Sequence, residues 1–266
     1  MYVTILGMST EPTGPGPFQP VKSADRALDV LEALARAPHR RALGQLAREL
    51  GIPKSSLHGI LRTMARRGWV ETDPGDARFG LGVRALQVGA AYVEADDTIS
   101  LLTGVLDELA AEFGETVHLG RLDGADVVYL AKRESTHPLR LFSAIGRRLP
   151  AHATALGKAL LAERPENHLT GRPDGRLTAL TRHTITDPDA LRADLTATRE
   201  RGYAVDREEN TDGIVCFAVA VPLRSPAVDA ISVSVPASRV DAATATAVPT
   251  ALRRVADRLR SARSLF

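Results

Sequence analysis

One thiol and seven scattered histidines are the side chains of this 266-residue chain best suited to nucleophilic or metal chemistry. Cys216 is the only cysteine, so the chain can form neither an internal disulfide nor a metal site built on a cysteine pair. The histidines show no His-Glu-x-x-His spacing, and the sequence contains no Gly-x-Ser-x-Gly elbow, phosphate loop or dinucleotide fingerprint. We therefore expect no catalytic residue, no metal and no cofactor.

Two further hypotheses remain for these side chains. Cys216 could be the nucleophile of a small-molecule enzyme with His118 or His152 as its base, although no pattern places a base and an orienting group beside the thiol. The same two histidines could contribute to a metal site. Against both, a lone cysteine in a run rich in valine and alanine is more often a small core residue.

Basic side chains concentrate in one segment near the N-terminus. Between Arg36 and Arg84, ten lysines and arginines accompany four acidic residues, whereas the whole chain carries a net charge of only +2. A compact basic segment on a nearly neutral chain is typical of a module that binds a polyanion. The alternative is an ordinary solvated helical surface.

This basic part of the chain contains three segments whose apolar residues recur with the periodicity of an α-helix, followed by a hairpin pattern. Pro38, Gly51 and Gly68 end the three helices, and we expect Ser23 to cap the first of them. An Asp-Pro-Gly-Asp turn then joins two short strands. This order predicts a winged helix-turn-helix. The helices are expected at residues 23–37, 43–50 and 53–67, and the strands at 69–72 and 78–81.

The third helix has one apolar and one polar face. Its apolar residues, spaced three and four apart, turn toward the domain core, so the opposite face can offer donors to base edges in the major groove of double-stranded DNA. That outward face carries no acid, and neighbouring arginines would flank a bound duplex. A winged helix used only for protein contacts is the alternative. The DNA-binding candidates are Arg40, Arg41, Lys54, Ser55, Ser56, His58, Arg62, Arg66 and Arg78.

The remainder of the chain alternates helical and β-rich segments, which predicts an α+β domain around an antiparallel sheet. Helices are expected at residues 99–113, 154–162, 189–201 and 242–264, and strands at 115–122, 126–133, 139–144, 213–223 and 228–235. The expected domains are a disordered tail (1–20), the winged helix-turn-helix (21–81), a linker helix (82–97) and an effector-binding and oligomerisation domain (98–266).

We expect this chain to work in the cytoplasm without a membrane partner. No apolar run approaches the roughly 18 residues of a membrane span. The N-terminal stretch lacks the basic region of a signal peptide, and a lone cysteine fits a reducing compartment.

Several stretches, in the same order along the chain, resemble the isocitrate-lyase-regulator (IclR) family of bacterial transcription factors. The most specific is Gly-Arg-Arg-Leu-Pro-Ala-His-Ala-Thr-Ala-Leu-Gly-Lys at residues 146–158. Residues 21–28, 46–56, 68–70, 79–82, 201–209 and 213–216 also match. Two departures stand out: Gly59 replaces an arginine common among relatives, and the spacing from Cys216 to Pro222 is longer than usual.

The resemblance implies a sensor-like (GAF/PAS-like) effector domain and a homodimer, often a dimer of dimers, on a pseudo-palindromic operator. The protein would act as a repressor or an activator, and we expect a repressor. A scaffold whose C-terminal domain only oligomerises is a further alternative.

The segment leading into the helix at residues 154–162 is the candidate effector site. Its first N–H groups lack partners within the helix and suit an anion such as a carboxylate, and small residues would let the ligand approach the backbone. Lys158 could point to the solvent or to the ligand. From this segment the candidates are Thr154, Ala155, Leu156 and Gly157. By resemblance, the opposite wall carries Asp206, Ile214, Cys216, Ser232 and Ser234.

Overall fold

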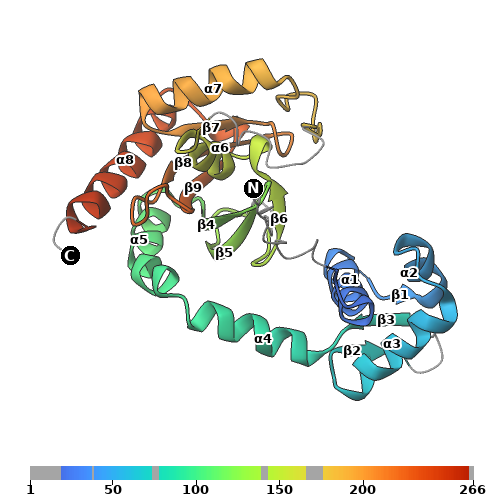
Figure 1. Ribbon diagram of the computed structural model, residues 1–266. Coiled ribbons are helices and arrows are strands. Elements are labelled where there is room, and N and C mark those ends of the chain that lie inside the picture. Colours follow the sequence, from blue (N-terminus) through green and yellow to red (C-terminus); the bar gives the residue numbers. More distant parts are fainter. Residues whose placement is uncertain (1–18, 38, 74–77, 139–142, 166–175, 264–266) are drawn as a thin grey trace, which may run out of the picture. The chain divides into compact units, whose positions relative to one another are not determined.

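The computed structural model describes residues 19–37, 39–73, 78–138, 143–165 and 176–263 (Figure 1). The chain separates into two compact units, Met1–Glu94 and Ala95–Phe266. Most of the expected disordered tail, residues 1–18, lies outside the described residues. Among the described helices, none is both long and apolar enough to cross a membrane.

The first unit has the helices and wing of a winged helix-turn-helix. Strands β1 and β2 each pair antiparallel with β3 in a small sheet, and leucines of the first three helices pack against Val70 and Phe79 of this sheet. The elements are α1 (Lys22–Arg36), β1 (Arg41–Ala42), α2 (Leu43–Glu49), α3 (Lys54–Arg66), β2 (Val70–Thr72), β3 (Arg78–Leu81) and α4 (Val83–Glu94).

Two details of this unit differ from expectation. Ser23 lies inside α1, whose N-cap is Val21 and makes no side-chain capping bond. Strand β1 was not expected, because two residues carry no periodicity; Arg41 and Ala42 become a strand by pairing with Phe79 and Arg78. Tertiary pairing therefore decides this element.

The second unit is built on a six-stranded antiparallel sheet in the order β6-β5-β4-β9-β8-β7. Helix α6 packs on one face and contacts α7, whereas α5 and α8 contact the sheet and each other (Figure 1). The helices are α5 (Asp97–Phe113), α6 (Ala155–Ala162), α7 (Pro188–Arg201) and α8 (Thr244–Arg263). The strands are β4 (Thr116–Asp123), β5 (Asp126–Arg133), β6 (Arg148–Pro150), β7 (Ala204–Arg207), β8 (Ile214–Ala220) and β9 (Asp229–Pro236).

The linker helix expected at residues 82–97 is shorter, and the chain turns before a new helix begins. Helix α4 ends at Glu94, and Asp96 caps α5 by accepting a hydrogen bond from the Ile99 N–H at 3.1 Å. The short strands β6 and β7 were also not expected. Of the strand expected at residues 139–144, residues 139–142 lie outside the described residues, and Ser143 and Ala144 belong to no strand.

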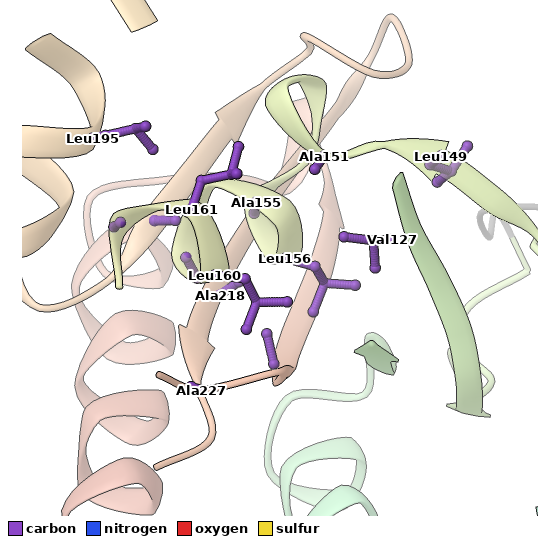
Figure 2. Close-up of a cluster of buried hydrophobic side chains, with 14 of the residues drawn as sticks. Val127, Leu149, Ala151, Ala155, Leu156, Leu160, Leu161, Leu195, Ala218 and Ala227 are labelled. Atoms are coloured by element: carbon purple, nitrogen blue, oxygen red, sulfur yellow. The ribbon is translucent and has the colours of Figure 1, made fainter. Parts of the chain in front are cut away.

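Helix α6 is buried on every side. All eight of its residues are buried, and Leu156, Leu160 and Leu161 pack among residues of the sheet and of α7 (Figure 2). Burying apolar area is the main stabilising contribution to a fold, so this short helix is anchored by packing rather than by helix propensity. The start of α6 is consequently a fixed point in the second unit.

Candidate DNA face and effector pocket

Helix α3 presents the polar face expected of a recognition helix. Leu57, Leu61 and Met64 are buried and Ile60 is half-buried. The outward candidates of this helix are all exposed: Lys54, Ser55, Ser56, His58, Arg62 and Arg66. Gly59 is exposed too, and an added Cβ there would meet no atom within 4 Å. This face can therefore approach a duplex closely.

Two of the candidate phosphate contacts already have acidic partners. Arg40 pairs with Asp73 and, at 3.3 Å, with Glu71, whereas Arg41 lies 2.7 Å from Glu49. Arg78 is exposed on β3. For Arg40 and Arg41, a phosphate would have to compete with a carboxylate, so we expect the outward residues of α3 to contribute more to affinity.

The second unit contains a pocket at the start of α6. Eight of the nine effector candidates line it, together with three residues that the sequence analysis missed. We call it the α6 pocket. Its lining residues are Tyr129, Thr154, Ala155, Leu156, Asp206, Asn210, Thr211, Ile214, Cys216, Ser232 and Ser234.

Sheet register explains why distant residues meet in this pocket. Cys216 pairs with both Asp206 and Ser234, and side chains of paired residues in an antiparallel sheet share a face. Ser232 is two residues from Ser234 and so shares that face too. The Cys216 thiol donates to the Ser234 hydroxyl at 3.2 Å. Strands β7, β8 and β9 thus form one wall opposite α6.

The three pocket residues that were not expected, Tyr129, Asn210 and Thr211, have only weak signals in the sequence. Tyr129 is a polar-tipped residue in an apolar strand, and its ring stacks on His118 with ring centroids 4.4 Å apart. Asn210 and Thr211 directly follow the matched stretch that ends at Glu209. Only the turn between β7 and β8 brings these two side chains to the pocket.

Gly157 does not line the pocket, and its N–H is not a free donor. It donates to the Thr154 hydroxyl at 3.0 Å, and the Lys158 N–H donates to the Thr154 carbonyl at 2.9 Å. Unpaired N–H groups were expected from Ala155 to Gly157. Only those of Ala155 and Leu156 remain, because the first N–H groups of a helix have no carbonyl acceptor within it. Glycine is required here by packing, because an added Cβ would lie 2.1 Å from the Ala151 carbonyl oxygen.

Lys158 points neither to the solvent nor to the pocket. Its side chain is fully buried and lies 2.7 Å from Glu209 and 2.9 Å from Asp194. It therefore anchors α6 to the turn after β7 and to α7, and both expectations for it were wrong.

The pocket wall opposite the start of α6 carries little charge, because the acidic groups of Asp206 and Cys216 both have raised pKa values. Asp206 is buried and accepts hydrogen bonds from the N–H groups of Glu209 and Asn210 at 2.7 and 3.3 Å. Burial, with the nearby Glu209 carboxylate, raises the pKa of Asp206 to about 7. Burial also raises the pKa of the Cys216 thiol, so the sulfur is held as a thiol and is a poor nucleophile.

His118 and His152 are both buried, and each forms a hydrogen bond with a group other than the thiol. His118 bonds Ser143 at 2.7 Å, and burial lowers its pKa to about 3. His152 bonds the Thr178 carbonyl at 3.1 Å. Neither belongs to the group of potential metal ligands found among the described residues.

A winged helix-turn-helix joined to a sheet-centred α+β domain defines a DNA-binding transcription regulator of the two-domain class. The sequence matches the IclR helix-turn-helix domain over residues 23–74 and the C-terminal domain of bacterial IclR transcriptional regulators over residues 90–261. The chain belongs to the IclR family. The family and its homologues are regulators, not enzymes, so the enzyme hypothesis built on Cys216 is set aside.

Individual relatives agree in sequence and in fold. The transcriptional repressor IclR of Escherichia coli is 35% identical over 225 residues, which cover 83% of this chain and 82% of that protein. A regulator structure from Alicyclobacillus acidocaldarius has a TM-score of 0.79 and 27% identity over 92% of this chain and all of that one. An IclR homologue from Microbacterium hydrocarbonoxydans, described as complexed with 4-hydroxybenzoate, has a TM-score of 0.72 and 22% identity over 92% of this chain and all of that one, which shows the fold alone.

Proposed function

We propose that this chain is a homodimeric, cytoplasmic repressor whose binding to a pseudo-palindromic operator is modulated by a small carboxylate in the α6 pocket. Family membership makes it a DNA-binding transcription regulator, and a relative named as a repressor supports the direction of control. In this proposal, residues 21–81 read DNA, 82–97 link the two functions and 98–266 bind the effector and oligomerise.

The α6 pocket is the observation that carries the effector proposal. The N–H groups of Ala155 and Leu156 open a helix whose dipole favours an anion. Across the pocket, Ser232 and Ser234 supply hydroxyls, and Asp206 can accept a hydrogen bond from a ligand hydroxyl. A hydroxylated carboxylate uses all of these groups. The Microbacterium homologue, described as a complex with such an acid, supports the same class of ligand.

The size of the pocket supports a link between ligand binding and conformation. The cavity volume of the pocket is about 10 Å³, the room of about one water molecule. An organic acid must therefore widen the pocket. A ligand that prefers a widened state shifts the protein toward it.

Dimer formation is supported by α4. None of its residues is buried, and Val83, Leu86 and Val88 are 69%, 71% and 55% exposed. Apolar side chains exposed around a helix fit contact with a second copy of the chain, and a two-fold dimer would present two recognition helices to two half-sites.

Calorimetry tests the effector proposal. The probe is 4-hydroxybenzoate, titrated into the full-length protein alone and into its complex with a duplex selected from a random-sequence library. If the acid releases the repressor, linkage requires it to bind the DNA complex more weakly, by about 1–3 kcal/mol. Ser234→Leu should abolish binding, whereas Ser238→Leu, at an exposed position, should not change it.

The outcomes separate the alternatives. Equal affinity with and without DNA would reject the switch, and undiminished binding by Ser234→Leu would reject the pocket. If the protein binds its duplex but neither 4-hydroxybenzoate nor any member of a panel of small organic acids, the C-terminal domain acts as an oligomerisation scaffold instead.

A further inference from the structure

Three side chains with metal-binding donors converge outside the α6 pocket. The ligand atoms of His183, Glu208 and Asp212 all lie within 4.8 Å of one another. His183 belongs to the segment before α7, whereas Glu208 and Asp212 belong to the turn between β7 and β8. An imidazole nitrogen and two carboxylate oxygens from two separate segments are a donor set that divalent first-row metals accept.

No cationic side chain that the structure describes forms an ion pair with either carboxylate of this cluster, Glu208 or Asp212, although the neighbouring Glu209 pairs with Lys158. Two carboxylates at this separation repel each other, and a cation between them would remove the repulsion. The hydrogen bond from the Gly213 N–H to Glu208 Oε2, at 2.7 Å, orients one carboxylate and leaves its other oxygen for a ligand role.

Other contacts hold the two segments together. The Thr181 hydroxyl donates to the Glu208 carbonyl at 2.7 Å, and the Thr184 hydroxyl donates to the Glu209 carbonyl at 2.6 Å. Because these bonds involve no metal-ligand atom, they fix the backbone around the three donors in advance. Such preorganisation lowers the ordering cost of binding a metal.

We propose that His183, Glu208 and Asp212 bind a divalent first-row transition metal, with Zn²⁺ as the reference ion. Three protein ligands leave room for water at the remaining position. Arg182 opposes the ion: its Nε donates to His183 Nε2 at 2.9 Å, so the neutral ring carries its own proton on Nδ1 while this contact is made. A neutral imidazole that coordinates through Nδ1 carries its proton on Nε2, so metal binding displaces the Arg182 contact.

The site has a consequence for the α6 pocket, and this consequence alone rests on the proposed effector site. Asn210 and Thr211 line the pocket from the same turn that carries Glu208 and Asp212, and Asp206 lines it from the adjoining strand β7. A bound metal would tie this turn to the segment before α7. Metal and effector would then influence each other's affinity by the same factor.

The test uses the full-length, tag-free protein after treatment with a chelator. Zn²⁺ is titrated by calorimetry, and Co²⁺ is added separately to follow the visible absorption of a coordinated ion. Wild type should bind one ion per chain at this site. His183→Ala and Asp212→Asn should each weaken binding by about tenfold or more. Arg182→Ala should strengthen it, since that change removes both a competing donor and a positive charge.

Matched controls separate this site from adventitious binding. His137→Ala and Asp189→Asn change exposed residues outside the cluster and should leave metal affinity unchanged. Circular dichroism and DNA binding report whether each variant is folded. Wild type that takes up no Zn²⁺ at millimolar metal would overturn the proposal, as would equal affinity in wild type, His183→Ala and Asp212→Asn. Because no effector is used, failure here leaves the proposed function intact.

Discussion

Lys158 Nζ lies 2.7 Å from Oε1 and 2.9 Å from Oε2 of Glu209, and both side chains are buried. Asp194 Oδ2 lies 2.9 Å from the same ammonium group. This cluster joins three elements: α6, whose N-terminus opens the α6 pocket, the turn after β7, and α7. The carboxylates thus neutralise a charge that would otherwise be unpaired in the core.

Lys158→Met should therefore destabilise the protein by about 3–5 kcal/mol, because it leaves the buried Glu209 carboxylate without a cation. Urea unfolding of wild type and variant measures the difference. Lys54→Met, at an exposed position of α3, is the control and should stay within about 0.5 kcal/mol of wild type. A Lys158→Met loss as small as that of the control would mean that the buried cluster contributes little to stability.

Gly157→Ala should cost at least about 3 kcal/mol, because its Cβ would lie 2.1 Å from the carbonyl oxygen and 2.3 Å from the Cα of Ala151. Backbone atoms cannot move aside as a flexible side chain can. The matched change Gly104→Ala, in α5, meets nothing within 4 Å and should raise stability by up to about 1 kcal/mol. Thermal unfolding compares the two. If the Gly157→Ala variant is as stable as wild type but no longer binds the effector, the glycine is needed for the ligand to approach the backbone and not for packing.

His118 should make the protein less stable in acid. Burial and the nearby Lys132 charge lower its pKa to about 3 in the folded state, against about 6.5 when unfolded. Between these two values the unfolded state binds a proton that the folded state does not, so stability falls as the pH falls from about 6.5 toward 3. Well below pH 6.5, this histidine should lower the free energy of unfolding by about 1.4 kcal/mol for each further pH unit.

The difference between wild type and His118→Phe isolates this effect, because phenylalanine can keep the stack on Tyr129 but cannot titrate. Denaturant unfolding at pH 7, 6 and 5 should show the wild type losing stability faster than the variant. His137→Phe, which removes an exposed histidine, serves as the control. Parallel pH profiles for wild type and His118→Phe would show that His118 is not held neutral.

Arg62→Ala should weaken specific DNA binding by about 1–3 kcal/mol if the side chain reaches a base edge. Arg62 is exposed on the polar face of α3. Fluorescence anisotropy with the selected duplex and with a scrambled one measures both affinity and preference. Arg260→Ala, in α8, is the control. If the Arg62→Ala variant keeps the wild-type affinity and site preference, Arg62 does not contact a base edge.

Operator affinity should fall steeply with salt, and Arg66→Ala should reduce the slope of log affinity against log salt by about 0.9 per lost phosphate contact. Arg40→Ala should change the slope less, because Arg40 already pairs with Asp73 and Glu71. Titrations from low to moderate salt give the slopes. A flat wild-type titration would mean that the basic segment is only a solvated surface.

The sequence by itself determined the winged helix-turn-helix, most long helices and strands, and the family. These features follow from local patterns: apolar spacing in residues 53–67, the glycines and prolines that end helices, and the match at residues 146–158. The polar face of α3 could likewise be predicted, because a helix's two faces follow directly from its periodicity.

Only the tertiary structure decided the short strands β1, β6 and β7, since two to four residues form a strand only when a partner strand supplies hydrogen bonds. It also decided the surroundings of individual side chains. Lys158 and Gly157 are adjacent in the chain, yet Glu209 and Asp194 neutralise the first and Ala151 crowds the second. Sheet register and one turn also bring residues together that are distant in the chain. The α6 pocket gains Tyr129, Asn210 and Thr211 in this way, and His183 comes close to Glu208 and Asp212. No local sequence pattern records such contacts.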